Sequence, residues 1–178
     1  MESLYEIDCR IFRSINKHHH HKILNKFFRT ITHLGGPVFT ITFVCMLFFF
    51  TNGTLKMTAL ASAISLTISH LPVAVTKKLY PRQRPYLVLT QINVLANPLK
   101  DHSFPSGHTT AIFSIVTPFI LSFPTWAALF IIIGLLVGIS RIFLGLHYPS
   151  DVMVGIILGS GSGIISYAIV QSWLLDFF

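Results

Sequence analysis

Five apolar runs, each about as long as a membrane span, constrain the fold of this chain more than any other feature of its sequence. They cover roughly residues 31–51, 57–76, 106–123, 126–144 and 151–175. A helix needs about 20 apolar residues to cross a bilayer, and in lipid its backbone polar groups must be satisfied within the segment. We therefore expect an all-α fold, a polytopic transmembrane helix bundle with about five spans, formed by one domain over residues 1–178. The first span is the weakest, because Gly35-Gly36-Pro37 falls where its helix would begin.

The composition supports a membrane protein and argues against nucleic-acid binding. Hydrophobic residues make up 52% of the chain and charged residues only 11%, where a soluble domain carries about a quarter. The net charge of +7 fits basic loops beside anionic lipid headgroups, and no basic and aromatic pattern for RNA binding is present. Cys9 and Cys45 lie in unlike surroundings, so neither a disulfide nor a thiolate metal site is expected.

Residues 1–30 are predicted to form a pair of amphipathic helices at the membrane surface rather than a span. Apolar residues recur there at helical spacing, and basic residues stand between them. This combination is typical of helices that lie in the headgroup plane. The consecutive histidines His18–His21 lie between the two helices, and we interpret them as a flexible, solvated turn, with metal binding as the alternative.

Glycines spaced four residues apart punctuate the last two runs. They are Gly134 and Gly138 in the fourth run, and Gly155, Gly159 and Gly163 in the fifth. This spacing permits helices to approach closely. We expect the glycines to serve packing within the bundle, with a homodimer through the Gly-rich spans as the alternative.

Three ionisable residues lie close together around the end of the fourth run. Arg141 stands near its end, His147 lies in the short gap that follows, and Asp151 opens the fifth run. Such residues are costly in lipid and are taken as functional by default. A carboxylate can accept the Nδ1 proton of a neighbouring imidazole, which leaves Nε2 free to act as a base, a ligand or a nucleophile. An arginine beside them suits phosphate, because its fork of donors matches the phosphate oxygens.

The polar loop predicted at residues 77–105 adds two further clusters. Lys77 and Arg84 belong to a basic stretch at its start, and Ser106–His108 follow its end and open the third run. The free N–H groups of a helix N-terminus bind anions, and a glycine there lets the anion approach the backbone. His108 would then stand beside the anion, where it could give or take a proton.

With five spans, the two loop clusters and the gap around His147 all fall on the same side of the membrane as the N-terminal segment. Together they supply cations, a helix N-terminus, two imidazoles and one carboxylate. These groups fit phosphoryl transfer without a metal: cations hold the phosphate oxygens, one histidine attacks, and the other protonates the leaving oxygen. The sequence offers no cluster of carboxylates suited to magnesium, so we expect neither a metal nor another cofactor.

These residues resemble the three motifs of the type 2 phosphatidic acid phosphatase (PAP2) superfamily. The motifs are Lys, six residues, then Arg-Pro; Pro-Ser-Gly-His; and Ser-Arg, five residues, His, three residues, Asp. The matching positions are Lys77, Arg84 and Pro85; Pro105, Ser106, Gly107 and His108; and Ser140, Arg141, His147 and Asp151. Every motif position is present, in order and at the family's spacing.

The resemblance implies a role for each of these positions. His147 would be the nucleophile that forms a phosphohistidine, Asp151 would orient it, and His108 would be the general acid. The residues that would hold the phosphate oxygens are Lys77, Arg84, Ser106, Gly107 and Arg141. Members of the family work without a divalent metal, and water cleaves the phosphohistidine.

The resemblance also implies a membrane lipid phosphate as substrate. The small size and short loops resemble bacterial members that act on undecaprenyl diphosphate, with phosphatidic acid and phosphatidylglycerophosphate as alternatives. Three rival interpretations stay open: a lipid phosphotransferase on the same scaffold, a soluble acid phosphatase or vanadium haloperoxidase, and a non-catalytic membrane scaffold. The five apolar runs argue against the soluble enzymes, and the intact motifs argue against the scaffold.

The family resemblance and the distribution of basic residues predict opposite sides of the membrane for the site. Larger members of the family commonly have six spans, and here the amphipathic segment stands in place of the first. The family usually faces its site away from the cytoplasm, and on that basis we expect a cell-membrane protein with an outward-facing site. However, of the 13 Lys and Arg residues only Lys56 lies on the opposite side, and such a bias normally marks the cytoplasmic side.

Overall fold

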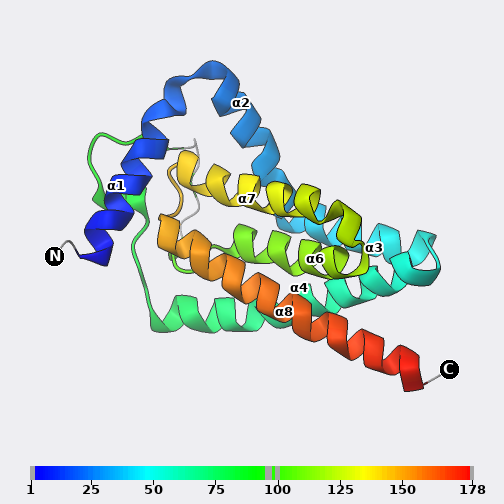
Figure 1. Ribbon diagram of the computed structural model, residues 1–178. Helices are drawn as coiled ribbons and strands as arrows, with labels where there is room; N and C mark the ends of the chain where they lie inside the picture. The colour runs from blue at the N-terminus through cyan, green and yellow to red at the C-terminus, as the bar shows by residue number, and fades with distance from the viewer. Residues whose placement is uncertain (1–2, 95–97, 99–100, 177–178) are drawn as a thin grey trace.

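The computed structural model describes residues 3–94, 98 and 101–176, and every regular element in that part of the chain is helical (Figure 1). The longer helices are α1 (Leu4–Asn16), α2 (Lys22–Ile31), α3 (Pro37–Phe50), α4 (Gly53–Leu79), α6 (Gly107–Ser122), α7 (Ala127–Phe143) and α8 (Pro149–Asp176). The short elements are α5 (Pro85–Val88), η1 (Lys17–His20), η2 (Thr32–Gly35) and η3 (Pro124–Trp126). The predicted all-α class is confirmed.

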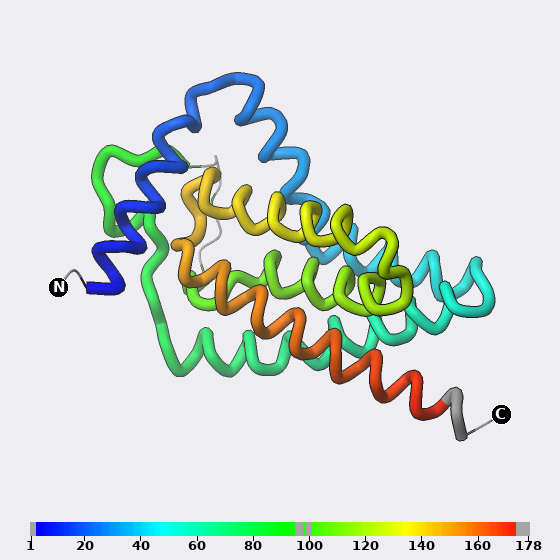
Figure 2. The backbone as a smooth tube through the Cα atoms, viewed as in Figure 1, coloured from blue at the N-terminus to red at the C-terminus, as the bar shows by residue number. Residues whose placement is uncertain are grey.

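Helix α6 lies at the centre of the bundle, packed against α4, α7 and α8 (Figure 2). All of its residues from Thr109 to Phe119 are buried. The glycines of α8 lie against it so closely that a Cβ atom at Gly159 would come within 2.5 Å of the Thr110 carbonyl oxygen. The predicted use of these glycines in packing within the bundle is thus confirmed, and Gly155, Gly159 and Gly163 are not available as a dimer face.

Each of the five predicted apolar runs contains a helix, but the helices differ in length. By length and composition, the described part of the chain holds three single helices able to cross a membrane, at Gly53–Leu79, Pro124–Phe143 and Pro149–Trp173. A fourth span arises only if Lys22–Gly35 and Pro37–Phe50, which meet at a bend of 53°, count as one. Helix α6 has only 16 residues. The chain is a membrane protein, while the number of five spans stays a prediction.

The bend before α3 falls where the sequence predicted a break. Gly36 precedes the helix with extended backbone, and Pro37 occupies its first turn, where a missing N–H costs nothing. The predicted loop at residues 77–105, by contrast, begins too early. Helix α4 continues to Leu79, because no residue that breaks a helix follows Lys77 until Pro81. Within this loop, residues 95–97 and 99–100 lie outside the described residues.

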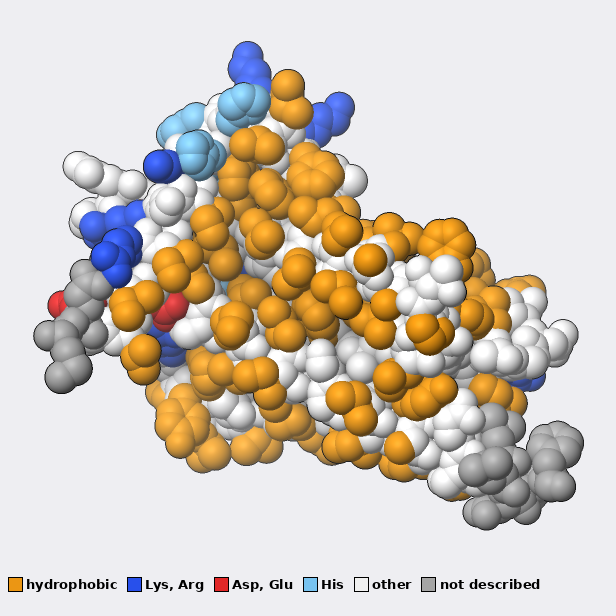
Figure 3. Space-filling view, viewed as in Figure 1, with side chains coloured by type: hydrophobic (Ala, Val, Ile, Leu, Met, Phe, Trp, Pro, Cys, Tyr) orange, Lys and Arg blue, Asp and Glu red, His pale blue; other side chains and the backbone are white. Residues whose placement is uncertain are grey.

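Helices α1 and α2 cross one end of the bundle, where α4 and α7 end and α6 and α8 begin (Figure 1). Asn16 fastens α1 there, since its side-chain amide donates to the carbonyl oxygens of Asn93 at 2.8 Å and Phe143 at 2.9 Å. Basic and histidine side chains gather at this end, whereas the surface over α7 and α8 is mainly hydrophobic (Figure 3). This arrangement fits the predicted position of residues 1–30 at a membrane surface.

The histidine tract is exposed at His18, His20 and His21, in agreement with the predicted solvated turn, but His19 departs from that prediction. The first three histidines lie in η1 together with Lys17, and His19 is only 9% exposed. The His19 ring stacks on Phe143, with ring centroids 5.7 Å apart, and its backbone carbonyl accepts a hydrogen bond from Asn25 at 2.9 Å. Among the described residues, no group of three or more His, Cys, Asp or Glu is arranged to hold a metal ion. His19 is therefore a packing residue.

Candidate active site

A cleft of about 630 Å³ opens at the end of the bundle that α1 and α2 cross. It is lined by five residues of the predicted site, namely Lys77, Arg84, Gly107, His108 and His147. Side chains of α3 and α4, among them Ile41 and Val73, form an apolar wall opposite. The cleft therefore combines a cationic end with an apolar one. Sequence analysis missed His70 and Asp101, which line it as well.

His147 lies in the short link between α7 and α8 and is 1% exposed. Its Nε2 atom is 3.2 Å from Nη1 of Arg84. A guanidinium group only donates hydrogen bonds, so Nε2 must carry its lone pair and the ring proton belongs on Nδ1. Nε2 is thus the ring nitrogen suited to attack a phosphorus atom.

Asp151 faces the other nitrogen of this imidazole, with its Oδ2 atom 3.6 Å from Nδ1 of His147. The same oxygen accepts a hydrogen bond from the Tyr148 N–H at 2.8 Å and another from the Ser103 hydroxyl. Ser103 also lies 3.5 Å from Nδ1, so it bridges the carboxylate and the ring. The predicted pairing of His147 and Asp151 is present in the structure, but Ser103 could not be foreseen because it lies outside the three motifs.

The surroundings of His147 favour its neutral form. Burial lowers the pKa of the imidazole to about 4, and the charges of Arg84 and Arg141 add to this effect, although the Asp151 carboxylate opposes it. A buried group avoids charge unless a partner compensates for the lost hydration. The lowered pKa of His147 therefore keeps its Nε2 atom unprotonated at neutral pH.

Arg84 is held from two sides and is only 1% exposed. Its Nη1 donates to the Leu146 carbonyl at 2.8 Å, and its Nε and Nη2 donate to the backbone and side chain of Asp101 at 2.8 and 2.7 Å. Asp101 also pairs with Lys77. Burial would raise the pKa of the Asp101 carboxyl, but Lys77 and Arg84 outweigh burial and lower it to about 2. Two of the three cations predicted to bind phosphate, Lys77 and Arg84, thus share one carboxylate.

Arg141 is buried beside these groups, with 3% of its surface exposed. Its Nη1 donates to the Thr32 hydroxyl at 2.8 Å, while Nε and Nη2 have no hydrogen-bond partner among the described residues. Buried donors of a charged group are costly to leave unpaired. An anionic ligand at this place would satisfy them, in accord with the predicted role of Arg141.

The N-terminus of α6 contributes unequally to the cleft. Gly107 and His108 line it, whereas Ser106 is fully buried and its hydroxyl hydrogen-bonds with Thr109 at 2.9 Å. Ser106 itself does not line the cleft, so its contact with phosphate stays a prediction. Gly35 packs against the start of α6, where a Cβ atom would lie 2.6 Å from the His108 carbonyl oxygen.

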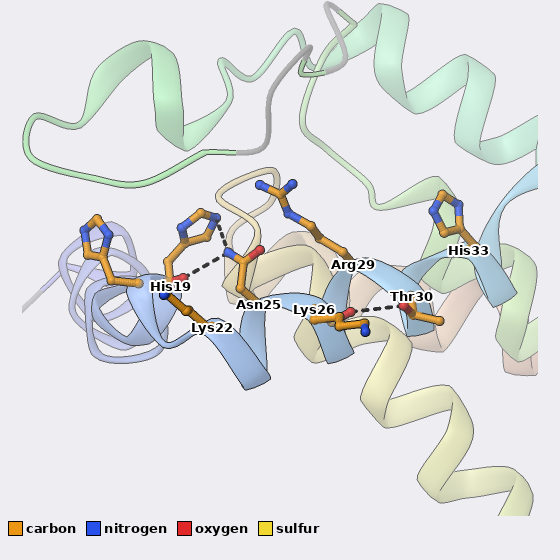
Figure 4. A pocket seen from close by; sticks show the side chains of 8 residues that line it. His19, Lys22, Asn25, Lys26, Arg29, Thr30 and His33 are labelled. Carbon is orange, nitrogen blue, oxygen red and sulfur yellow. Dashed lines mark hydrogen bonds between the residues drawn. The ribbon is translucent and has the colours of Figure 1, made fainter.

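A second hollow lies along α2 and holds none of the predicted site residues (Figure 4). It measures about 660 Å³, and its lining includes Lys22, Lys26, Arg29 and His33. His33 also lines a smaller hollow together with His108. The N-terminal segment thus provides a second hollow, lined by basic residues of α2, outside the cleft.

The family model described as the PAP2 superfamily matches residues 55–174. The chain belongs to the PAP2 superfamily. The three motifs predicted this membership, and the match covers all of them while leaving α1, α2 and α3 outside.

Individual relatives agree with the family. The chain is 29% identical to "Undecaprenyl-diphosphatase BcrC" of Bacillus subtilis over 161 residues, which cover 86% of this chain and 81% of that protein. The crystal structure of Aquifex aeolicus LpxE superposes with a TM-score of 0.71 at 31% identity, covering 90% of this chain and 94% of that one. A PAP2-type phosphatidylglycerolphosphate phosphatase from Bacillus subtilis has the same fold, with a TM-score of 0.76 at 23% identity over 100% and 89% of the two chains. Over several other curated relatives, the chain spans only about half of their length.

Proposed function

We propose that this protein is a membrane phosphatase that removes phosphate from a lipid phosphate or diphosphate, with undecaprenyl diphosphate as the preferred substrate. One observation carries the proposal: the buried His147 lies between Arg84 and Asp151 in a cleft whose other wall is apolar. The names of relatives support the choice of substrate, since several are undecaprenyl-diphosphatases. Phosphatidic acid and phosphatidylglycerophosphate are the alternative substrates.

In the first step, Nε2 of His147 attacks the terminal phosphorus. A P–N bond forms, the bond from phosphorus to the leaving oxygen breaks, and His108 donates a proton to that oxygen. The negative charge of the bound phosphate favours the protonated form of His108 that this step requires. Lys77, Arg84 and Arg141 stabilise the negative charge on the other phosphate oxygens in the transition state. Electrostatic stabilisation of this kind is usually the largest single contribution to catalysis. Asp151 stabilises the Nδ1–H of the ring as the ring becomes positively charged.

In the second step, water attacks the phosphohistidine. His108, now neutral, takes a proton from the water, the P–N bond breaks, and inorganic phosphate leaves. Before substrate arrives, Asp101 is the carboxylate that pairs with Lys77 and Arg84. The phosphate would replace it as the partner of these two cations.

The apolar wall of the cleft supports entry of the substrate from the bilayer. Ile41 of α3 and Val75 of α4 are each 54% exposed, so apolar side chains continue from the wall onto the outer surface of these helices. A lipid chain can remain against this surface while its headgroup reaches the cations. We place the site on the outer side of the cell membrane, as the family resemblance implies.

Phosphate release in detergent with EDTA tests the proposal. Wild-type protein would be compared with His147→Ala on undecaprenyl diphosphate, phosphatidic acid and phosphatidylglycerophosphate. His21→Ala, which alters an exposed histidine of the N-terminal tract, is the matched control. We expect EDTA-resistant release from wild type and the control, fastest with undecaprenyl diphosphate, and none from His147→Ala. Folded wild-type protein that releases phosphate from none of the lipids would refute the proposal.

A further inference from the structure

Helix α1 buries a carboxylate next to the link between α7 and α8, which contains His147. Asp8 is only 6% exposed, on the same face of the helix as the buried Phe12 and Asn16. Its Oδ1 atom accepts the backbone N–H of Ser150 at 2.9 Å, and its Oδ2 atom accepts the Ser150 hydroxyl. Oδ2 also accepts a hydrogen bond from Nη2 of Arg82 at 2.7 Å. An N-terminal carboxylate thus contacts the residue that immediately precedes Asp151.

Arg82 connects this carboxylate to Asp151. Its Nη1 atom donates to Oδ1 of Asp151 at 2.8 Å and to the Ser150 hydroxyl at 2.7 Å. Its guanidinium lies over the ring of Tyr148, 4.1 Å from the ring centroid. The guanidinium is therefore fixed by three acceptors and one aromatic face, and a planar fork held in this way has little freedom to turn.

These contacts fix the carboxylate that orients the nucleophile. Arg82 holds Oδ1 of Asp151, while Ser103 and the Tyr148 N–H hold Oδ2, the oxygen that faces His147. Without a second acidic partner, the positive charge of Arg82 would also offset the negative charge of Asp151 and so weaken the stabilisation that Asp151 gives to a positively charged imidazole. Asp8 supplies a second carboxylate for the same guanidinium, so that Asp151 can still stabilise the ring when it becomes positive.

We propose that Asp8 is a positioning residue for phosphoryl transfer, which acts through Arg82 to hold Asp151 in place and to balance the Arg82 charge. The proposal rests on the phosphatase function proposed above. Asp8 lies outside residues 55–174, the range of the family match, so it belongs to the part of the chain that the motifs do not reach. On this account, α1 completes the active site in addition to lying at the membrane surface.

The direct test compares Asp8→Asn with wild type in detergent, using whichever lipid of the panel wild type hydrolyses fastest. The substitution keeps the shape of the side chain and removes its charge. We expect kcat to fall about tenfold, the scale for residues coupled in one ion-pair network, while KM stays within about twofold because Lys77, Arg84 and Arg141 are unchanged. Glu6→Gln is the control, since it removes a charge from the exposed side of the same helix and still allows capping.

A double-mutant cycle separates this role from simple anchoring of α1. In an Arg82→Gln background, Asp8→Asn should lower kcat by less than about twofold, because the connection to Asp151 is already lost. If Asp8 only anchors α1 through Ser150, the tenfold loss will recur in that background, which would overturn the proposal. Should Asp8→Asn not fold, Arg82→Lys serves instead: lysine keeps the charge without the fork, and an unchanged kcat would overturn the proposal.

The two proposals fail in different ways. Wild-type protein that releases no phosphate refutes the phosphatase function itself. Active wild-type protein with an equally active, folded Asp8→Asn variant refutes only the role of Asp8.

Discussion

Helices α1 to α3 contain none of the motif residues, whereas α4 to α8 and the links between them contain all of them. The N-terminal helices nevertheless reach the site, because Asp8 binds Arg82 and Thr32 binds Arg141. The difference indicates a division of work: the C-terminal bundle supplies the groups proposed to touch phosphate, and the N-terminal segment holds some of those groups in place. Substitutions matched across the two regions can test this division.

The largest expected effect belongs to the bundle. Arg84→Ala should lower kcat/KM by about 10²–10³, the scale for one donor that stabilises developing charge. Arg29→Ala, at an exposed arginine of α2, is the matched control and should leave the rate within about twofold. Phosphate release under identical conditions measures both, and equal losses in the two variants would contradict the division.

Thr32→Val tests a supporting residue of the N-terminal region. The substitution keeps the size of the side chain but leaves Nη1 of the buried Arg141 without its partner. We expect kcat/KM to fall about tenfold, since a buried donor left unpaired costs about 1–3 kcal/mol. Thr30→Val is the control, because within the described part of the chain the Thr30 hydroxyl donates to the Lys26 carbonyl of its own helix. No loss in Thr32→Val would show that Arg141 needs no support from this segment.

Gly35→Ala tests the close packing between the two regions. The added Cβ atom would lie 2.6 Å from the His108 carbonyl oxygen and 2.8 Å from Cγ1 of Val137, so η2 must move away from α6. Overpacking of this kind costs about 1–3 kcal/mol, and we expect a lower Tm together with a loss of activity of a few-fold. Gly161→Ala, where a Cβ atom meets nothing within 4 Å, should change neither. A Tm of Gly35→Ala equal to that of wild type would show that the two regions do not pack as described.

The smallest expected effect is on the pH dependence. The nucleophile must be neutral, and a pKa of His147 lowered to about 4 keeps it neutral over a wider range than an ordinary imidazole. As the pH falls from 7, kcat/KM should therefore persist through pH 6.5 and be lost only toward the lowered value, once the ionisation of the substrate phosphate is taken into account. An acid limb near pH 6.5 would contradict the assignment of this environment to the nucleophile.

The sequence carried enough information to predict the helical class and the motif residues, for two physical reasons. Lipid demands long apolar runs, which hydropathy reveals directly, and the residues proposed to bind phosphate occur at the family's fixed spacings in the chain. The position of Lys77 was less well predicted, because a polar composition alone does not end a helix, and α4 continues up to the residues before Pro81.

The supporting residues left no comparable signal. Asp8 and Arg82 are 74 positions apart, and Thr32 and Arg141 are 109 apart, so only the folded chain brings each pair together. Ser103 and Asp101 lie near the second motif but outside it, and a serine or an aspartate in a polar loop is unremarkable by itself. His19 was misjudged because a run of histidines suggests solvent exposure, whereas the Phe143 ring covers its side chain.

The formation of a phosphohistidine at His147 tests the central claim most directly. Wild-type protein, His147→Ala and the exposed control His21→Ala would be mixed with the lipid substrate carrying phosphorus-32 in its terminal phosphate, and then quenched in alkali. We predict label on wild type and on the control that is stable in alkali and lost in acid, and no label on His147→Ala. Acid-labile label that persists in folded His147→Ala would place the nucleophile elsewhere and contradict the account.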